Sequence, residues 1–201
     1  KETVDKLLDK HVDGMIIFLE DHYKEDYSHI VRLKEKNYPF VLIDRYIPEF
    51  ETDYVIINNN DAMARVCSYL RYNRSCEEIV FIPSNDASIA ASSSDEKLLG
   101  YKRSIHMLYG REDSTVMMLE DFVDKIGTIC KRYKNVGVCL NHDTMIPDLH
   151  RKLAEAGKTI PANCHFFGYN NSYEKPFYPT VEQSNDQMGR KAAEILIEKL
   201  K

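Results

Sequence analysis

The sequence lacks the patterns that mark most enzymes, metal proteins and membrane proteins. It contains no G-x-S-x-G, no glycine-rich phosphate loop and no H-E-x-x-H, so no nucleophile–base pair is recognisable. No apolar run approaches the roughly 18–20 residues that a transmembrane helix needs. No signal peptide is visible, because the chain opens on the charged stretch from Lys1 to Lys10. We therefore expect no catalytic residue, no metal ion, no cofactor and no membrane partner.

Cysteine is scarce and scattered. The five cysteines are an odd number and include no C-x-x-C pair, which argues against zinc ligation and a disulfide framework. Reduced, mostly buried thiols in a cytoplasmic protein are therefore expected. The formal net charge is −5, with both signs present. This balance gives no electrostatic reason for the chain itself to bind DNA or an anionic membrane.

What the chain does contain is a regular alternation of short apolar runs and helical periods. The runs predict buried strands at Met15–Leu19, Phe40–Ile43, Asp53–Ile57, Ile79–Ile82, Thr115–Leu119, Val136–Leu140 and His165–Phe167. Helical periods lie between them, and a long amphipathic helix is expected at Asn185–Leu200. The alternation predicts an α/β fold with parallel sheets covered on both faces. Two sets of it, separated near Pro83–Ser94, predict two similar doubly wound lobes joined by a hinge.

Seven short motifs, in order along nearly the whole chain, resemble one family. They are Val12-Asp13-Gly14-Met15-Ile16-Ile17, Pro39-Phe40-Val41-Leu42-Ile43-Asp44-Arg45, Val55-Ile56-Ile57-Asn58-Asn59, Lys97-Leu98-Leu99-Gly100-Tyr101, Asn141-His142-Asp143-Thr144-Met145, Gly157 to Pro161 with Phe166 to Asn171, and Pro179 to Gln183 with Met188-Gly189. Singly each motif is weak, but together they resemble the ligand-sensing domain of lac repressor/gal repressor (LacI/GalR) type regulators.

This resemblance implies a periplasmic-binding-protein-like class I fold with a ligand cleft between two lobes. The expected N-terminal lobe comprises residues 1–84 and 183–201, and the C-terminal lobe comprises residues 85–182. The family has a first strand and helix before the position of Lys1 and a last strand after that of Lys201. The resemblance also implies a DNA-binding head that this chain lacks, and a homodimer.

Ligands of open α/β sheets bind outside the carboxyl ends of the strands, so polar residues just after the strands are candidate contacts. Asp44 follows the strand Phe40–Ile43, and its carboxylate can accept hydrogen bonds from two sugar hydroxyls. It could instead cap a helix or pair with Arg45. Arg45 could clamp the ligand, although the ion pair with Asp44 is slightly favoured.

Two further candidates come from the expected hinge region. Ser84 follows the fourth strand together with Asn85 and Asp86, and a ligand contact or a turn after Pro83 are equal alternatives. Lys97 stands where the family carries an arginine that reaches the ligand. A lysine is a point charge and loses bidentate contact, and a solvated helix lysine is an equal alternative.

The last candidates follow the two strands nearest the C-terminus. His142 replaces the family's asparagine, and we expect it to face the ligand, whereas Asp143 is expected mainly to cap the next helix. Asn170 stands where the family has a ligand-binding aspartate, and its amide can still donate and accept. Tyr169 offers a ring for a sugar to stack on, although such a ring is more often part of a core.

The resemblance implies a regulator's sensor: a small effector, a sugar or sugar derivative, closes the lobes and changes DNA binding through the upstream head. Lys97 and Asn170, in place of arginine and aspartate, favour a modified or acidic sugar. The alternative is a periplasmic sugar-binding protein of a transporter or chemosensor, against which the five cysteines argue mildly. An enzyme acting on a sugar is a third class, and no motif supports it.

Overall fold

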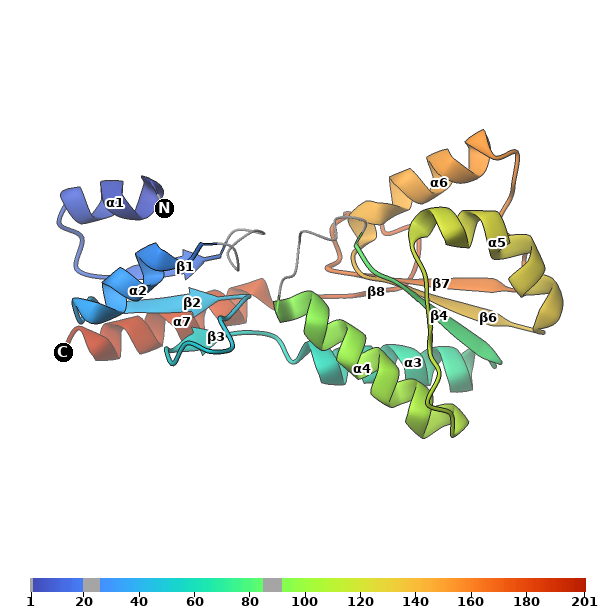
Figure 1. Ribbon diagram of the computed structural model, residues 1–201, viewed down its shortest axis with the longest axis horizontal. Helices are drawn as coiled ribbons and strands as arrows, with labels where there is room; N and C mark the ends of the chain where they lie inside the picture. Colours follow the sequence, from blue (N-terminus) through green and yellow to red (C-terminus); the bar gives the residue numbers. More distant parts are fainter. Residues whose placement is uncertain (1, 20–25, 85–91) are drawn as a thin grey trace. The chain divides into compact units, whose positions relative to one another are not determined.

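The computed structural model describes residues 2–19, 26–84 and 92–201 and contains two compact units, each built on parallel strands (Figure 1). Unit 1 contains the described residues of Lys1–Ile57, Ser88–Ser93 and Ser184–Lys201. Unit 2 contains those of Asn58–Ala87 and Ser94–Gln183. The predicted α/β class with two parallel sheets is therefore confirmed.

Unit 1 has a three-stranded parallel sheet in the order β1-β2-β3. Its strands are β1 (Met15–Phe18), β2 (Phe40–Ile43) and β3 (Tyr54–Val55), and its helices are α1 (Glu2–Asp9), α2 (Ser28–Glu35) and α7 (Asn185–Lys199). Apolar side chains of α1 and α2 form one core cluster with β1 and β2. Figure 1 shows α7 on the opposite side of this sheet, where Leu196 approaches Gly14 at the entrance to β1.

Unit 2 has five parallel strands in the order β5-β4-β6-β7-β8. They are β4 (Glu78–Ile82), β5 (Thr115–Val116), β6 (Val136–Leu140), β7 (Cys164–Tyr169) and β8 (Thr180–Val181). The helices are α3 (Asn59–Asn73), α4 (Ser92–Tyr109), α5 (Leu119–Arg132) and α6 (Ile146–Glu155), with a 3-10 turn, η1 (Asp143–Met145), before α6. In Figure 1, α5 and α6 lie on one side of the sheet and α3 and α4 on the other.

The alternation of side chains along a strand explains why both faces of this sheet are packed. Val80 and Ile82 of β4 join the cluster that contains residues of α5 and α6, whereas Ile79 and Phe81 join the cluster that contains residues of α3 and α4. All five residues of β4 are buried, as are all five of β6. A continuous apolar run is the expected signature of such a strand.

The division into units differs from the expected one. The sequence prediction placed residues 1–84 in the N-terminal lobe, but β4 pairs with β5 and β6 of unit 2, and the boundary lies between Ile57 and Asn58. The second predicted boundary, at residue 183, differs by one residue from the Ser184 of the structure. An apolar run shows that a strand is buried but carries no information about which sheet it joins.

Several elements differ in length from the prediction. Phe40–Ile43 and Val136–Leu140 were predicted with the bounds that the structure has. The strand expected at Thr115–Leu119 has only two residues, since Leu119 already begins α5. The short β8 was not predicted as a strand, because two residues are too few for periodicity to show.

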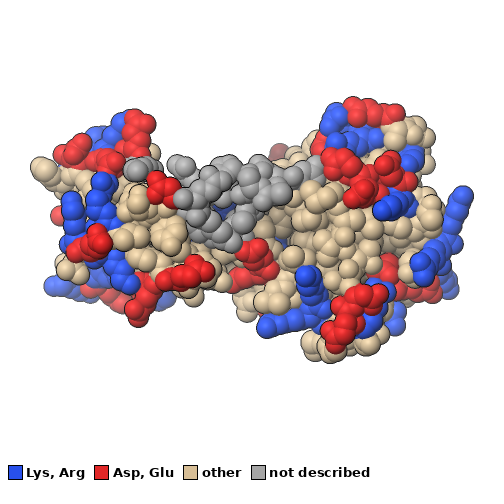
Figure 2. Space-filling model, viewed as in Figure 1, with Lys and Arg blue, Asp and Glu red and all other residues tan. Residues whose placement is uncertain are grey.

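The remaining composition-based predictions concern thiols and charge. All five cysteines are free and buried, as predicted. Figure 2 shows lysine and arginine side chains interspersed with aspartate and glutamate over the visible face of both units. No helix in the described ranges is long and apolar enough to cross a membrane.

Candidate functional site

In unit 1 the candidate residues Asp44 and Arg45 come directly after β2, at the carboxyl end of the sheet. Asp44 has a left-handed backbone (φ 69°) and donates its N–H to the carbonyl of Val55 at 2.9 Å. Aspartate is one of the residues that tolerate this conformation, which here turns the chain immediately after the strand. The strand end is therefore fixed by its backbone, and the carboxylate side chain remains partly exposed, at 20%.

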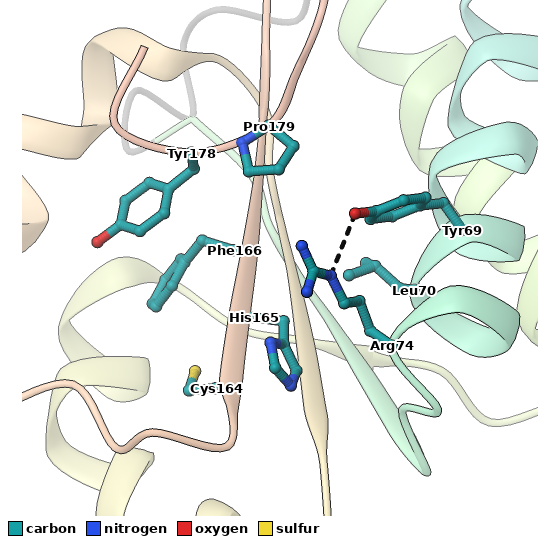
Figure 3. A pocket seen from close by; sticks show the side chains of 8 residues that line it. All are labelled: Tyr69, Leu70, Arg74, Cys164, His165, Phe166, Tyr178 and Pro179. Atoms are coloured by element: carbon teal, nitrogen blue, oxygen red, sulfur yellow. Dashed lines mark hydrogen bonds between the residues drawn. The ribbon is translucent and has the colours of Figure 1, made fainter.

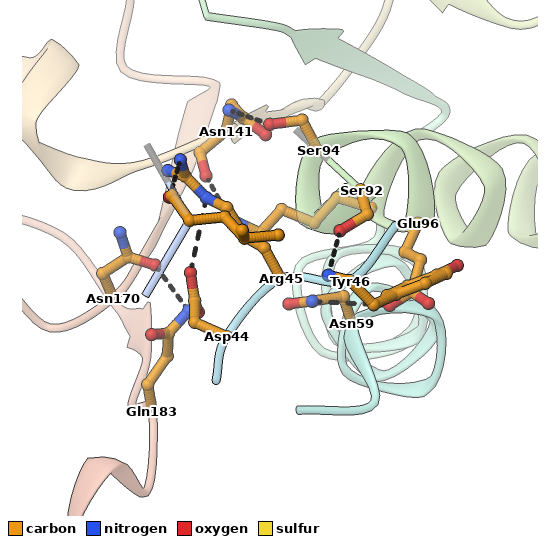
Figure 4. Close-up of polar contacts among 12 residues, drawn as sticks. Asp44, Arg45, Tyr46, Asn59, Ser92, Ser94, Glu96, Asn141, Asn170 and Gln183 are labelled. Atoms are coloured by element: carbon orange, nitrogen blue, oxygen red, sulfur yellow. Dashed lines mark hydrogen bonds and ion pairs between the residues drawn. The ribbon is translucent and has the colours of Figure 1, made fainter. Parts of the chain in front are cut away.

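Arg45 is held by three neighbours. Its Nε lies 3.6 Å from Oδ2 of Asp44, its Nη1 donates to the carbonyl of Leu19 at 2.9 Å, and its guanidinium lies 4.8 Å from the ring centre of Phe18. The ion pair between Asp44 and Arg45, one of the two predicted alternatives, is thus present (Figure 4). It does not occupy all the acceptor capacity of a carboxylate, which has about four lone-pair sites.

A serine of unit 1 that the sequence analysis did not select forms a hydrogen bond with the same loop. The hydroxyl of Ser92, the first residue of α4, accepts the backbone N–H of Tyr46 at 3.1 Å (Figure 4). Ser92 is almost completely buried. Tyr46 stacks on Tyr54 with 4.9 Å between ring centres. The partner of this serine lies 46 residues earlier in the chain, so the contact is not visible in the sequence.

In unit 2 the residue that organises the carboxyl end of the sheet is Asp143. Its side chain is only 1% exposed, and it accepts three hydrogen bonds. Oδ1 accepts the N–H of Tyr169 at 2.9 Å, and Oδ2 accepts the N–H of Ser172 at 3.0 Å and the hydroxyl of Thr180 at 3.1 Å. Three donors offset the cost of burying the carboxylate. The prediction that Asp143 is mainly a helix cap is therefore wrong: its carboxylate holds the ends of β7 and β8.

Asn170 lies directly after β7 within the segment that Asp143 holds. Its backbone is left-handed (φ 94°), and its N–H donates to the carbonyl of Val181 at 2.9 Å. Its side-chain Oδ1 accepts a hydrogen bond from Nε2 of Gln183 at 3.0 Å (Figure 4). This contact fixes which way the amide points and leaves its NH₂ group as a donor. Asn170 thus occupies the same place after β7 that Asp44 occupies after β2.

Lys97 and Tyr169 lie in the interior of unit 2. Lys97 is only 4% exposed, so the alternative of a solvated helix lysine is wrong. Its Nζ donates to the carbonyl of Asn141 at 3.0 Å and lies 4.1 Å from the ring centre of Tyr169. The Tyr169 hydroxyl donates to Oδ1 of Asn59 at 2.8 Å, and its buried ring belongs to a core cluster, which was the alternative expected for this residue. Direct ligand contact by either residue stays a prediction.

His142 and Ser84 also lie just beyond strands. His142 follows β6 by two residues, is half-buried, and shares a hydrogen bond between its Nδ1 and the hydroxyl of Thr144. Ser84 follows β4 by two residues and is half-buried. Asn85 and Asp86, which were grouped with Ser84, lie outside the described residues. Contact of His142 or Ser84 with a ligand stays a prediction.

Asn141 was quoted as part of a motif but not selected as a site residue. It directly follows β6, is nearly buried, and donates from Nδ2 to the hydroxyl of Ser94 at 3.2 Å (Figure 4). Its Oδ1 is buried without a hydrogen-bond partner among the described residues. The signal that could have found it is position, since it is the first residue after a wholly apolar strand, as Asp44 is.

The arrangement supplies hydrogen-bonding groups at the carboxyl end of each sheet. Within the described residues, no group of three histidine, cysteine, aspartate or glutamate side chains could hold a metal ion. A carboxylate, amides and an imidazole at strand ends suit the binding of a small ligand rich in hydroxyls.

The chain is similar over its whole length to bacterial regulators, although no protein-family model matches it. It is 27% identical over 214 residues to a Paenibacillus polymyxa protein described as "Probable HTH-type transcriptional regulator EndR", covering 100% of this chain and 60% of that protein. It is 26% identical over 213 residues to the HTH-type transcriptional repressor PurR of Vibrio atlanticus, covering 100% and 61%. The chain thus spans about 60% of the length of these curated relatives.

Solved structures show the same fold. A regulatory protein of LacI family from Chloroflexus aggregans matches with a TM-score of 0.76 at 17% identity, covering 99% of this chain and 73% of that one. A LacI family transcriptional regulator from Enterococcus faecalis with bound ribose matches with a TM-score of 0.69 at 21% identity, covering 99% and 73%. A complex of the transcriptional regulator CelR with cellobiose matches with a TM-score of 0.71 at 22% identity, covering 99% and 62%.

The two units have the α/β fold of the periplasmic-binding-protein-like class I type, as expected. More particularly, the chain is similar over its whole length to transcriptional regulators, and its fold matches that of a regulatory protein of the LacI family, the family that its motifs resemble. The relatives named above are transcriptional regulators and not enzymes, in agreement with the prediction that the domain does no chemistry on its ligand.

Proposed function

We propose that this domain binds a sugar or sugar derivative and thereby controls the DNA affinity of a cytoplasmic transcription regulator. The observation that carries the proposal is the equivalent placement of Asp44 and Asn170. Each is the first residue after a buried parallel strand, and each has a left-handed backbone held by a backbone hydrogen bond to the neighbouring strand. Left-handed backbone in residues other than glycine clusters at binding sites, among other places. Ribose and cellobiose in structural relatives support the ligand class.

The proposed chemistry uses the groups at both carboxyl ends. Asp44 accepts hydroxyl hydrogens through a charged oxygen, which strengthens those bonds. Asn170 donates through its NH₂ group, while Gln183 holds its oxygen. His142 can donate or accept through its imidazole. Asn170 carries no charge, and Lys97 donates to the carbonyl of Asn141 inside unit 2. These two residues stand where the family resemblance implies an aspartate and an arginine. The proposed ligand is therefore a modified or acidic sugar.

The proposed regulation requires an energetic difference and not contact alone. An effector changes the balance between two arrangements of the units only by as much as it binds one better than the other. DNA contact is assigned to a head outside this chain, and the working form to a homodimer.

A thermal-shift screen of the full-length protein against sugars, sugar acids and sugar phosphates tests the ligand class. At a concentration of about 100 times Kd, one-site linkage gives roughly 2.7 kcal/mol of stabilisation. We expect a selective shift that Asp44→Asn and Asn170→Ala each abolish. The matched control is Asp124→Asn, because that carboxylate is 77% exposed on α5 and lies away from the strand ends. A folded protein that responds to no sugar would overturn the proposal.

Control of DNA binding is tested separately. Fluorescence anisotropy with DNA fragments from upstream of the protein's own coding region would report release or tightening when the identified effector is added. A ligand that stabilises the protein but leaves DNA affinity unchanged would support the binding site and contradict the regulatory role.

A further inference from the structure

A second pocket lies in unit 2, away from the carboxyl ends of the strands. It is lined by three elements: the end of α3, the first half of β7, and the segment that leads into β8 (Figure 3). Its volume is about 170 Å³, and its lining residues are Tyr69, Leu70, Arg74, Cys164, His165, Phe166, Tyr178 and Pro179. Dry protein cavities of similar size hold a benzene-sized molecule. The pocket therefore fits a ligand of one ring.

The pocket exists because β8 is short. It pairs only with Gly168 and Tyr169 of β7, so the stretch Cys164–Phe167 is paired with β6 on one side and with no described strand on the other. The backbone groups of Phe166 point to the same side as those of Gly168, whose N–H donates to Pro179. Since a strand rises about 3.3 Å per residue, Asn170 lies roughly 16 Å along β7 from His165. The two sites are therefore distinct.

The walls of the pocket are aromatic. Phe166 and Tyr178 lie 5.0 Å apart between ring centres, and Figure 3 shows them on the side of the pocket opposite Tyr69. Cys164 is buried in the same cluster as Phe166, whereas Leu70 is buried in the cluster that Tyr69 packs against. A planar ring of a ligand can pack against such a wall in the offset or tilted geometry that aromatic pairs prefer.

Arg74 gives the pocket its charge. Its Nε donates to the hydroxyl of Tyr69 at 3.1 Å, and its guanidinium lies 5.6 Å from that ring centre. Within the described part of the chain, no acidic side chain lines the pocket or forms an ion pair with Arg74. The charge of Arg74 also affects the neighbouring His165. Burial is the larger cause that lowers the pKa of His165, and the charge of Arg74 is the second. A guanidinium fixed beside a ring-sized space is suited to bind a carboxylate through two parallel hydrogen bonds.

We propose that this pocket is an accessory site for a small aromatic carboxylate, whose carboxylate pairs with Arg74 and whose ring packs on Phe166 and Tyr178. The site is independent of the effector site proposed above. It gives the protein a second small-molecule input of a different chemical class, an aromatic acid in place of a polyol.

Fluorine NMR of para-fluorobenzoate with the full-length protein tests this proposal. So small a ligand is expected to bind with a Kd of about 1 mM or tighter. Loss of the charge-assisted bonds in Arg74→Gln is expected to weaken binding about 10- to 100-fold. The matched control is Arg132→Gln, since Arg132 likewise lies over a neighbouring ring, 5.3 Å from that of Tyr133, but on the exposed end of α5. It should leave the affinity unchanged.

Two further measurements locate the bound probe. The neutral analogue para-fluorobenzyl alcohol should bind at least about 10-fold more weakly, because it lacks the carboxylate. Bound carboxylate should also raise the pKa of His165, followed by its ring proton shifts, because it neutralises the charge of Arg74. Absence of binding to the folded protein at about 10 mM probe, equal binding by Arg74→Gln, or equal binding of the neutral analogue would each overturn the proposal. Displacement of the probe by an identified sugar effector would contradict the separation of the two sites.

Discussion

The sheets of the two units differ in how completely helices and buried side chains cover them. In unit 2 each face of the sheet carries its own buried cluster, one with residues of α5 and α6 and one with residues of α3 and α4. In unit 1 a cluster of eight buried residues packs on one face, and α7 covers part of the other face, where Val41 and Ala192 are buried. On β1, the side chains of Ile16 and Phe18 are 42% and 56% exposed. The strand pattern of the sequence is equally apolar in both units, so pattern alone does not determine how completely a sheet is covered.

This difference has an energetic consequence. Buried apolar area contributes about 25 cal/mol per Å², so a sheet whose apolar side chains are all buried is harder to open than one that leaves some of them exposed. Local stability therefore differs along the chain, and amides of unit 2 are expected to exchange more slowly than those of unit 1.

The largest test of the comparison replaces one phenylalanine in each unit. Phe122→Ala removes a fully buried ring from α5, and we expect a loss of about 3–5 kcal/mol of unfolding free energy. Phe18→Ala removes an exposed ring whose main contact is the guanidinium of Arg45, so a loss below about 1 kcal/mol is expected. Denaturant unfolding measures the loss of unfolding free energy for each variant, and hydrogen exchange shows which unit is affected. Similar losses for the two variants would contradict the difference in packing.

The second test concerns the carboxylate of Asp143. Asp143→Ala leaves the N–H groups of Tyr169 and Ser172 and the hydroxyl of Thr180 without their acceptor, and we expect a loss of about 2–4 kcal/mol. The effect should concentrate in unit 2, as faster exchange of the Tyr169 and Ser172 amides. Asp124→Ala, an exposed carboxylate on α5, should change stability by less than about 0.5 kcal/mol. Unchanged exchange at Tyr169 would remove Asp143 from its assigned role.

Asp143 also shows where prediction from sequence ends. Strands such as Phe40–Ile43 were predictable because a run of apolar residues is a local signal. The role of Asp143 was not, because the donors it holds lie 26 to 37 residues further along the chain. The same reason explains the misplaced β4, whose partners β5 and β6 come later in the sequence.

The candidate site likewise has features that the sequence predicted and features that it could not predict. The rule that polar residues follow strand ends placed Asp44 and Asn170 at the carboxyl ends, as the structure has them. The burial of Lys97 and Tyr169 could not be predicted, since it depends on their contacts with Asn141 and Asn59. Position after a strand is a local property, whereas the direction and burial of a side chain are not.

The third test compares the closest backbone approaches in the two units. A Cβ at Gly100 of α4 would lie 2.6 Å from the carbonyl oxygen of Asn60, which is backbone and cannot yield easily. Gly100→Ala is therefore expected to cost about 1–3 kcal/mol. In unit 1, a Cβ at Gly14 would meet the flexible end of Leu196 at 2.8 Å, with the nearest backbone atom, the carbonyl oxygen of Pro39, at 3.1 Å, so Gly14→Ala should cost less.

Gly127 of α5 serves as the control for the glycine variants, because a Cβ at this position would have open space within 4 Å. Gly127→Ala should stabilise the protein by up to about 1 kcal/mol through helix propensity alone. Thermal unfolding of the three variants measures the order. A larger loss for Gly14→Ala than for Gly100→Ala would reverse the comparison between the units.

The smallest expected effect is a pH dependence confined to unit 2. Burial, and then the charge of Arg74, lower the pKa of His165 in the folded protein below its ordinary value of 6.5. As the pH falls below about 6.5, the unfolded chain takes up a proton at this histidine before the folded chain does, so stability decreases. His165→Gln keeps a donor for Asn135, which accepts from Nε2 of His165 at 3.2 Å, and should flatten this dependence between about pH 7 and 5.5. Arg74→Gln should reduce it without abolishing it, because burial is the larger cause. Exchange rates of β7 amides across this pH range measure the effect, and an equal slope in the wild type and His165→Gln would assign it to another group.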